Sequence, residues 1–296
     1  MLPVHNFSYG VLTPSLGYLM SCLGAYLGLR CTVRAREYTG TERARWLLLA
    51  AVSIGTTGIW VMHFIAMLGY TIPGQTIRYN VPVTITSMLI AVAVVYLGLL
   101  IVGFGPEGGR SLLAAGLITG IGVAVMHYTG MAAMRMSARM TYSPVLLAVS
   151  VLIAIIAATA ALWAALRLKN VWSTLGAALI MGVAVSGMHY TGMAAMHVYP
   201  APAATGMPMG GATAENFLLP LILGISILNF ILTATIALSP NDDEIRADAD
   251  LMQRIAQTGA DPSAPAHSVS PGAAAKRPGS AASRAIEGRR QAERKP

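Results

Sequence analysis

Three histidines are the residues whose type and spacing could carry chemistry. A segment that starts with Met-His occurs three times, as MHFIAMLGY at 62–70 and as MHYTGMAAM at both 126–134 and 188–196. Its histidines are His63, His127 and His189, separated by 64 and then 62 residues. Imidazole is a common ligand of copper, zinc and iron. One histidine in each repeat therefore predicts a shared metal or cofactor site.

Methionines accompany each histidine at helical spacing. Residues four apart lie on one face of a helix, which pairs His63 with Met67 and repeats the pair in the other copies. The methionines expected as ligands directly precede a histidine or follow it by one turn: Met62, Met67, Met126, Met131, Met188 and Met193. Thioether sulfur selects Cu(I), and carboxylates, which calcium or magnesium need, are expected in none of the spans. The set favours copper; the alternative is that the methionines only pack and each histidine only joins helices.

Four more residues are expected beside the ligands rather than on the metal. Met134 and Met196 extend the methionine stripe by one turn. Tyr128 and Tyr190 lie about 100° around the helix from their histidines, which suits residues that contact the ligands. Glycines at the fifth position of the two identical copies, Gly130 and Gly192 in the chain, are expected to let another backbone approach closely.

Membrane helices must position these residues. The chain has 296 residues, of which 55% are hydrophobic and 11% charged, against about 45–50% and about 25% in soluble domains. Seven stretches have the roughly 20 apolar residues that cross a bilayer: about 9–29, 46–68, 81–104, 111–134, 145–166, 173–196 and 217–238. They lack the alternation of barrel strands. The predicted fold class is an all-α polytopic membrane helical bundle, seven transmembrane helices built on three two-helix repeats.

Basic residues in the loops predict the orientation. The loops after spans one, three and five hold eight Arg and Lys, and those after spans two, four and six hold three. The positive-inside rule then places the N-terminus and the histidines toward the outside and the C-terminus in the cytoplasm. No Lys or Arg precedes the first span, so a cleavable signal peptide is not expected. The net charge of +8 reports topology, and we expect membrane lipid but no nucleic acid as a partner.

Two regions are expected along the chain. Residues 1–238 form the membrane domain, and residues 239–296 form a polar cytoplasmic tail. The tail is expected to contain one short helix over 241–257 and to be disordered beyond it. Because this tail is too short for a signalling domain, output is expected to pass to a separate cytoplasmic signalling protein.

The repeated motif resembles the MHYT family of bacterial integral-membrane sensor domains. The likeness covers a unit of about 9–200, with a seventh span after it, and rests on GIWVMHFIAM, AVMHYTGMAAM and GMHYTGMAAM. The resemblance implies a multi-pass protein of the bacterial inner membrane that holds copper and senses oxygen, carbon monoxide or nitric oxide. It implies roles for these residues: Met62, His63, Met126, His127, Tyr128, Met188, His189 and Tyr190. The first copy departs from the motif, with Phe64 in place of tyrosine and Ile65 in place of threonine.

Two other functions stay open. Haem held between two of the histidines would make a membrane redox protein. A copper transport or handling protein would use the outer methionines, including Met207 and Met209, as an entry path. No nucleophile–base–carboxylate set or phosphate-binding loop is recognisable, so an enzyme is not expected.

Overall fold

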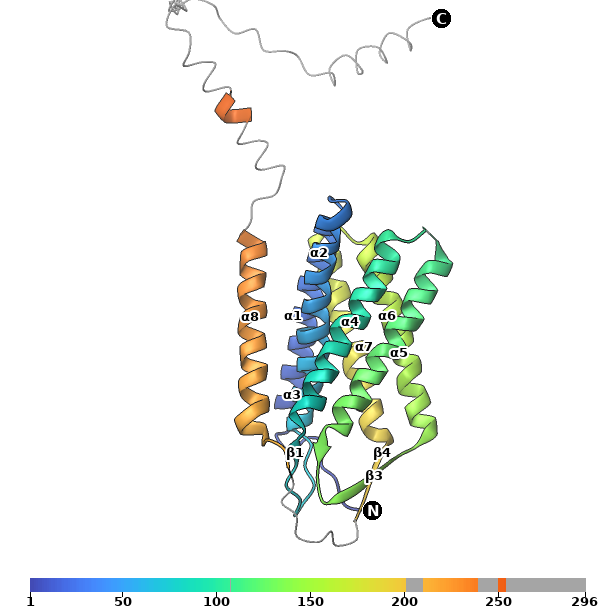
Figure 1. The fold of residues 1–296 in the computed structure, drawn as a ribbon, viewed down its shortest axis with the longest axis vertical. Coiled ribbons are helices and arrows are strands. Elements are labelled where there is room, and N and C mark those ends of the chain that lie inside the picture. Colours follow the sequence, from blue (N-terminus) through green and yellow to red (C-terminus); the bar gives the residue numbers. More distant parts are fainter. Residues whose placement is uncertain (107, 201–209, 239–249, 254–296) are drawn as a thin grey trace, which may run out of the picture. The chain divides into compact units, whose positions relative to one another are not determined.

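A computed structural model describes residues 1–106, 108–200, 210–238 and 250–253 of the chain. Seven helical segments within this part are long and apolar enough to cross a membrane. The protein is therefore an all-α, multi-pass membrane bundle, as the sequence predicts (Figure 1). Met207, Met209 and most of the helix predicted over 241–257 lie outside the described residues.

The spans follow one another along the chain with short connections. In chain order the helical segments are α1 (Leu12–Ala35), α2 (Gly40–Val52), η1 (Ser53–Val61), α3 (Met62–Leu68), α4 (Val81–Phe104), α5 (Gly109–Ala132), α6 (Pro144–Arg167), α7 (Val171–Ala195), η2 (Ala214–Leu218) and α8 (Leu219–Leu238). The second span runs without a break through α2, η1 and α3. Its middle part, η1, has the wider π-helical turn, which often marks functional sites.

Local sequence signals explain where several helices begin. The side chain of Asn80 accepts a hydrogen bond from the backbone N–H of Val83 at the start of α4. Asn170 caps α7 in the same way by accepting from the N–H of Trp172. Proline occupies the first turn of α4 and α6, where its missing N–H costs nothing.

Three spans differ from the sequence prediction at a boundary, and the first of them covers Leu12–Ala35 rather than about 9–29. The second span begins at Gly40 rather than near 46, and the seventh begins at Ala214 rather than near 217. These starts bring Glu42 and Glu215 into the first turns of α2 and η2, so the expectation that no span contains a carboxylate is wrong at two helix ends. An acid in a first turn is stabilised by the helix dipole, which extends both helices beyond their apolar cores.

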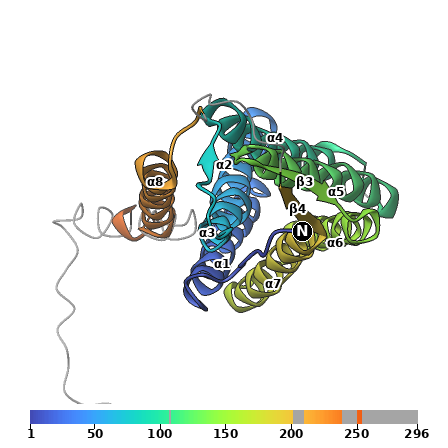
Figure 2. The ribbon, with the colours of Figure 1, turned by 90° about the horizontal axis from the view of Figure 1, so that it is seen from below.

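Six spans form a closed ring. The first span packs against the second, each later span packs against the one before it, and α7 returns to contact α1. Figure 2, a view along the helices, shows this ring with α8 outside it, beside the second span. The histidine-bearing segments α3, α5 and α7 alternate with α1, α4 and α6, and contact one another inside the ring.

Small residues let neighbouring spans come close. A Cβ added at Gly120 would lie 2.7 Å from the backbone nitrogen of Ile155 on α6, and one at Gly116 would meet Thr159. The GxxxG pair thus brings α5 against α6, as such motifs do in membranes.

Short strands, which the sequence analysis did not predict, cover the histidine end of the bundle. The strands are β1 (Arg78–Tyr79), β2 (Met134–Arg135), β3 (Ala138–Tyr142) and β4 (Met196–Pro200), and they pair antiparallel as β1–β2 and β3–β4. The N-terminal segment joins them, because the N–H of Leu2 donates to the carbonyl of Val198 and His5 bridges to Thr71.

Candidate metal centre

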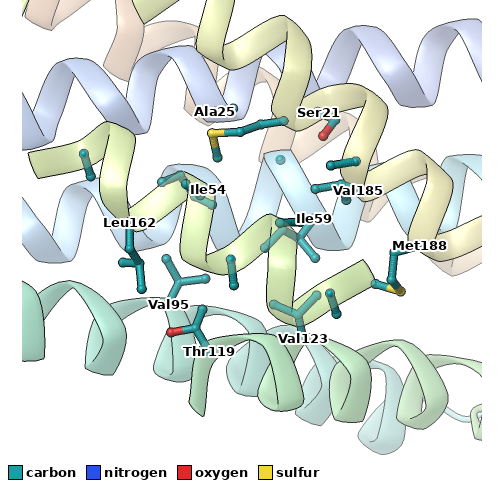
Figure 3. Close-up of a pocket in the computed structure, with 18 of the residues that line it drawn as sticks. Ser21, Ala25, Ile54, Ile59, Val95, Thr119, Val123, Leu162, Val185 and Met188 are labelled. Carbon is teal, nitrogen blue, oxygen red and sulfur yellow. The ribbon is translucent and has the colours of Figure 1, made fainter. Parts of the chain in front are cut away.

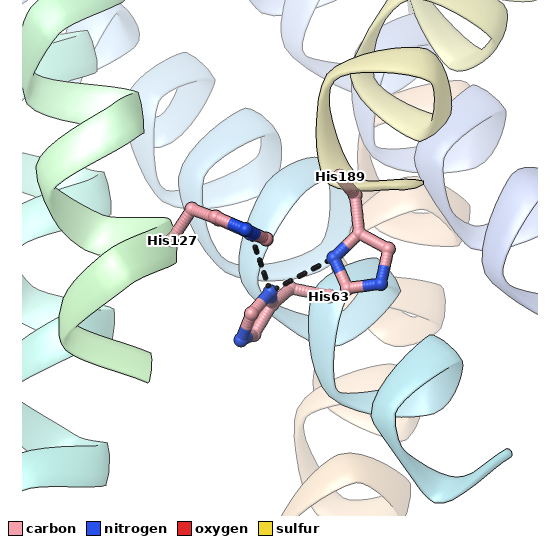
Figure 4. A group of neighbouring side chains, drawn as sticks. All are labelled: His63, His127 and His189. Atoms are coloured by element: carbon pink, nitrogen blue, oxygen red, sulfur yellow. Dashed lines mark hydrogen bonds between the residues drawn. The ribbon is translucent and has the colours of Figure 1, made fainter. Parts of the chain in front are cut away.

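The three predicted histidines meet at one point inside the ring. His63 extends from α3, His127 from α5 and His189 from α7, and Figure 4 shows their rings turned toward one another. Nδ1 of His63 lies 3.0 Å from Nδ1 of His189 and 3.1 Å from Nδ1 of His127. The ring planes of the three pairs meet at 82°, 84° and 87°. None of the three side chains is more than 1% exposed.

The hydrogen bonding of this cluster is incomplete within the protein. A contact between two Nδ1 atoms needs one N–H and one lone pair, and Nδ1 of His63 takes part in both contacts. The Nε2 atoms of all three histidines are buried and have no hydrogen-bond partner in the described part of the chain. Buried groups without a partner cost free energy, so an additional bonding partner would stabilise the cluster.

The donor set fits a single metal ion. One ring nitrogen from each histidine lies within 4.8 Å of the others, and no carboxylate or thiol belongs to this group in the described residues. Two nitrogens that bind one ion at about 2.0–2.1 Å lie at most about 4 Å apart. Two of the nitrogen pairs already satisfy that limit. Neutral nitrogen ligands without carboxylates match copper or zinc and not calcium or magnesium.

An aromatic ring follows each histidine and packs edge-to-face on it. The ring centroids of Phe64, Tyr128 and Tyr190 lie 4.7, 4.9 and 4.9 Å from those of the preceding histidines. The hydroxyl of Tyr128 is 2.7 Å from that of Ser150, whereas the hydroxyl of Tyr190 is buried and has no hydrogen-bond partner within the described ranges. The feature common to the three copies is therefore the ring, which explains why phenylalanine fits in the first copy.

The motif glycines make room for imidazoles. A Cβ added at Gly130 would strike Nε2 of His63, and one added at Gly192 would strike Nε2 of His127. The expected approach of another backbone is wrong here, because the nearest atoms at both glycines belong to a histidine side chain. Each glycine on one inner helix thus receives the histidine of the preceding copy.

The predicted methionines lie in the core. None of the eight methionines of the three motifs is more than 4% exposed: Met62, Met67, Met126, Met131, Met134, Met188, Met193 and Met196. Most belong to one buried cluster with the aliphatic core. This burial agrees with packing as well as with ligation, and their role as ligands stays a prediction.

The two other histidines at this end stay outside the cluster. His197 lies on β4 opposite Thr141, and His5 pairs with Thr71. His197 is thus a strand residue, and His5 belongs to the N-terminal segment that covers this end. Sequence reasoning missed Phe7, whose ring lies 5.4 Å from that of Tyr190, because no local signal places the N-terminal segment over the third copy.

A cavity of about 60 Å³ lies inside the ring (Figure 3). Met188, next to His189, lines the histidine side, and Ala25 and Leu162 line its wall further along the bundle. Almost all of its lining is aliphatic, and the polar exceptions are Ser21 and Thr119. Apolar cavities of this kind stay dry and take up small apolar molecules.

The fold and the site define a class of protein. It is a polytopic helical membrane protein in which three repeated helix pairs each bring one histidine to a common centre. A family model described as "Bacterial signalling protein N terminal repeat", MHYT, matches residues 57–116 and 120–178. Two repeats of the MHYT family, which include His63 and His127, are therefore present in this chain.

Curated relatives share the membrane region. The bifunctional diguanylate cyclase/cyclic di-GMP phosphodiesterase MucR of Pseudomonas aeruginosa is 39% identical over 193 residues, which are 64% of this chain and 28% of MucR. The cyclic di-GMP phosphodiesterase NbdA of the same organism is 38% identical over 75% of this chain and 28% of its own length. The signaling protein YkoW of Bacillus subtilis is 28% identical over 64% of this chain and 24% of YkoW. The chain thus spans about a quarter of the length of these relatives. No solved structure matches it.

Proposed function

We propose that this protein is an inner-membrane sensor that holds copper at His63, His127 and His189 and responds to a diatomic gas or to redox state. The convergence of three buried imidazoles from three repeats carries the proposal. The two repeats of a signalling family support the sensor role. The known activities of MucR and NbdA belong to those proteins, and we propose no enzymatic activity for this membrane region.

The spacing of the histidines favours one ion over haem. Two axial ligands of a haem lie on opposite faces of the macrocycle. Nitrogen atoms 3.0 and 3.1 Å apart leave no space for a macrocycle between them. The cavity of about 60 Å³ that reaches Met188 is likewise suited to molecules of a few atoms.

That cavity supports a small apolar ligand. Bound Cu(I) would offer the site an affinity for carbon monoxide, oxygen or nitric oxide, which imidazole alone lacks. The aliphatic lining excludes water and lets a gas dissolved in the lipid accumulate beside Met188. The three aromatic rings, each packed edge-to-face on a histidine, hold the imidazoles in place.

A route for the response runs through the second span and α8. Asn229 on α8 is 7% exposed and its amide donates to Thr57 at 2.6 Å and to Ser53 at 3.3 Å. Both acceptors lie in the π-helical segment that leads directly into His63. A shift of His63 on ligand binding is therefore passed to the span that leads to the C-terminal tail, and from there to a separate cytoplasmic signalling protein. The N-terminus and the metal site lie on the outer side in this proposal.

Metal analysis of the purified full chain tests the proposal. We expect about one copper per chain in the wild type and a near-complete loss in the variant with His63→Ala, His127→Ala and His189→Ala. The double variant His5→Ala with His197→Ala is the matched control, because it removes histidines at the same end outside the cluster, and it should retain copper. Equal copper contents in wild type and triple variant would overturn the metal assignment. A sharp haem α-band in the reduced-minus-oxidised spectrum would favour haem instead, and histidine-dependent copper uptake into vesicles would favour transport.

A further inference from the structure

A recess of about 620 Å³ lies at the end of the bundle opposite the histidines. It is bordered by the C-terminal ends of α1 and α6, by α2 near its start, and by the connection between α4 and α5. Its polar lining residues are Arg36, Arg43, Arg167 and Ser111. Nothing in the proposed sensing mechanism uses this recess.

The arginines of the recess form no ion pair with another described residue, and Glu107, in the connection between α4 and α5, lies outside the described residues. The one ion pair between side chains in the described residues joins Arg45 to Glu42, outside the recess. Arg36 donates to the carbonyl of Leu166 at 2.9 Å and to that of Leu168, so its charge is hydrogen-bonded but not neutralised. Burial, and then the positive charge of Arg43, lower the pKa of Arg36. Several positive charges thus meet here without an anion among the described residues.

Two polar atoms of the recess are buried and have no hydrogen-bond partner among the residues that the structure describes. They are Nε of Arg43 and Oγ of Ser111. The guanidinium of Arg43 stacks over the ring of Phe104, with 5.3 Å between Cζ and the ring centroid. This contact fixes the side chain while leaving its Nε–H without an acceptor. A phosphate oxygen would supply the missing acceptor, and arginine suits phosphate by charge and geometry.

The walls of the recess are apolar and lie at the ends of the membrane spans. Trp163 and Phe104 are each 50% exposed at the ends of α6 and α4, as aromatic residues are at membrane–water interfaces. Val102, Leu112 and Leu166 add aliphatic side chains to the lining. Basic pockets between transmembrane helices bind the headgroups of acidic lipids.

We propose that this recess binds a phosphate-bearing anion, and that the anion is the headgroup of an anionic phospholipid. The phosphate would lie against Arg43, Arg167 and Ser111, while the apolar walls would contact the adjoining acyl chain. Arg36 positions the end of α6 through its two carbonyl contacts. The site is independent of metal binding, since it lies at the other end of the helices.

Native mass spectrometry of the purified full chain with defined lipids tests the proposal. We expect phosphatidylglycerol to remain bound in preference to phosphatidylcholine. The variant Arg43→Gln with Arg167→Gln should lose about 25-fold in affinity for phosphatidylglycerol, from about fivefold per arginine. The matched control Arg45→Gln with Arg110→Gln removes the same charge at the same end from residues that do not line the recess, and it should bind as the wild type does.

A second experiment distinguishes a lipid headgroup from a soluble anion as the source of the phosphate. Inorganic phosphate is added to the detergent-purified protein, and thermal unfolding is followed. One outcome would overturn the lipid as the bound molecule and leave a soluble anion in its place. In it, phosphate stabilises the wild type but not the variant Arg43→Gln with Arg167→Gln, and the wild type shows no preference for phosphatidylglycerol. Equal binding of both lipids by the wild type, together with no effect of phosphate, would overturn the site even if the double variant fails to fold.

Discussion

Replacement of Gly192 by alanine tests the packing of the histidine cluster. An added Cβ would strike Nε2 of His127 and lie 2.9 Å from its Cδ2 and 3.2 Å from its Cε1. Real Cβ contacts are almost never that short, so either the imidazole or the helix must move. Gly187 is the matched control, because it lies on the same helix and a Cβ there meets nothing within 4 Å.

Comparing the two variants separates the steric contact with His127 from the general effect of alanine on helix stability. Alanine in place of glycine inside a helix stabilises it by about 0.5–1 kcal/mol, which applies to both positions. Overpacking in a filled core costs about 1–3 kcal/mol and applies to Gly192 alone. We therefore expect Gly192→Ala to be less stable than Gly187→Ala by about 1–3 kcal/mol. If the His127 side chain instead moves out of the cluster, the same free-energy cost weakens metal binding by about 5- to 150-fold.

Thermal unfolding in detergent and competition with a Cu(I) chelator measure the two quantities. Gly187→Ala should match or slightly exceed the wild type in stability and bind copper equally well. The same stability and the same copper affinity in both variants would refute the reasoning, since the contact between Gly192 and His127 would then carry no free energy.

Three further predictions rest on single contacts. Asn229→Ala should leave copper binding unchanged and lower the thermal stability by the equivalent of about 1 kcal/mol. Faster hydrogen exchange in α8 would show that this helix is released from the second span, whereas unchanged exchange would argue against the route through Thr57. Ala158→Leu should fill the cavity and abolish xenon binding detected by ¹²⁹Xe NMR. The control Ala160→Leu, on the exposed face of α6, should still bind xenon, and binding by both variants would place the gas outside this cavity. Arg36→Ala should lower the free energy of unfolding by about 1–3 kcal/mol, because charged donors at the end of α6 are lost, and an effect no larger than that of an exposed arginine would contradict this.

The sequence by itself determined the membrane spans and the residue types that meet at the site. A bilayer requires about 20 apolar residues per span, so all seven spans are readable from composition. The repeated Met-His motif predicts His63, His127 and His189 as partners, because equivalent positions in parallel repeats lie at one depth. The aromatic neighbours Tyr128 and Tyr190 follow from the helical period in the same way.

Contacts between distant segments were decided only by the tertiary structure. The closure of α7 on α1, the placement of Gly192 against His127 and the strands at the histidine end each join residues far apart in the chain. No local period encodes such contacts. The recess at the opposite end is a further example, since its arginines come from α1, α2 and α6 and gather only when the ring closes. Hydrophobic length and helical period thus determine which residues enter the membrane, while side-chain packing determines which of them meet.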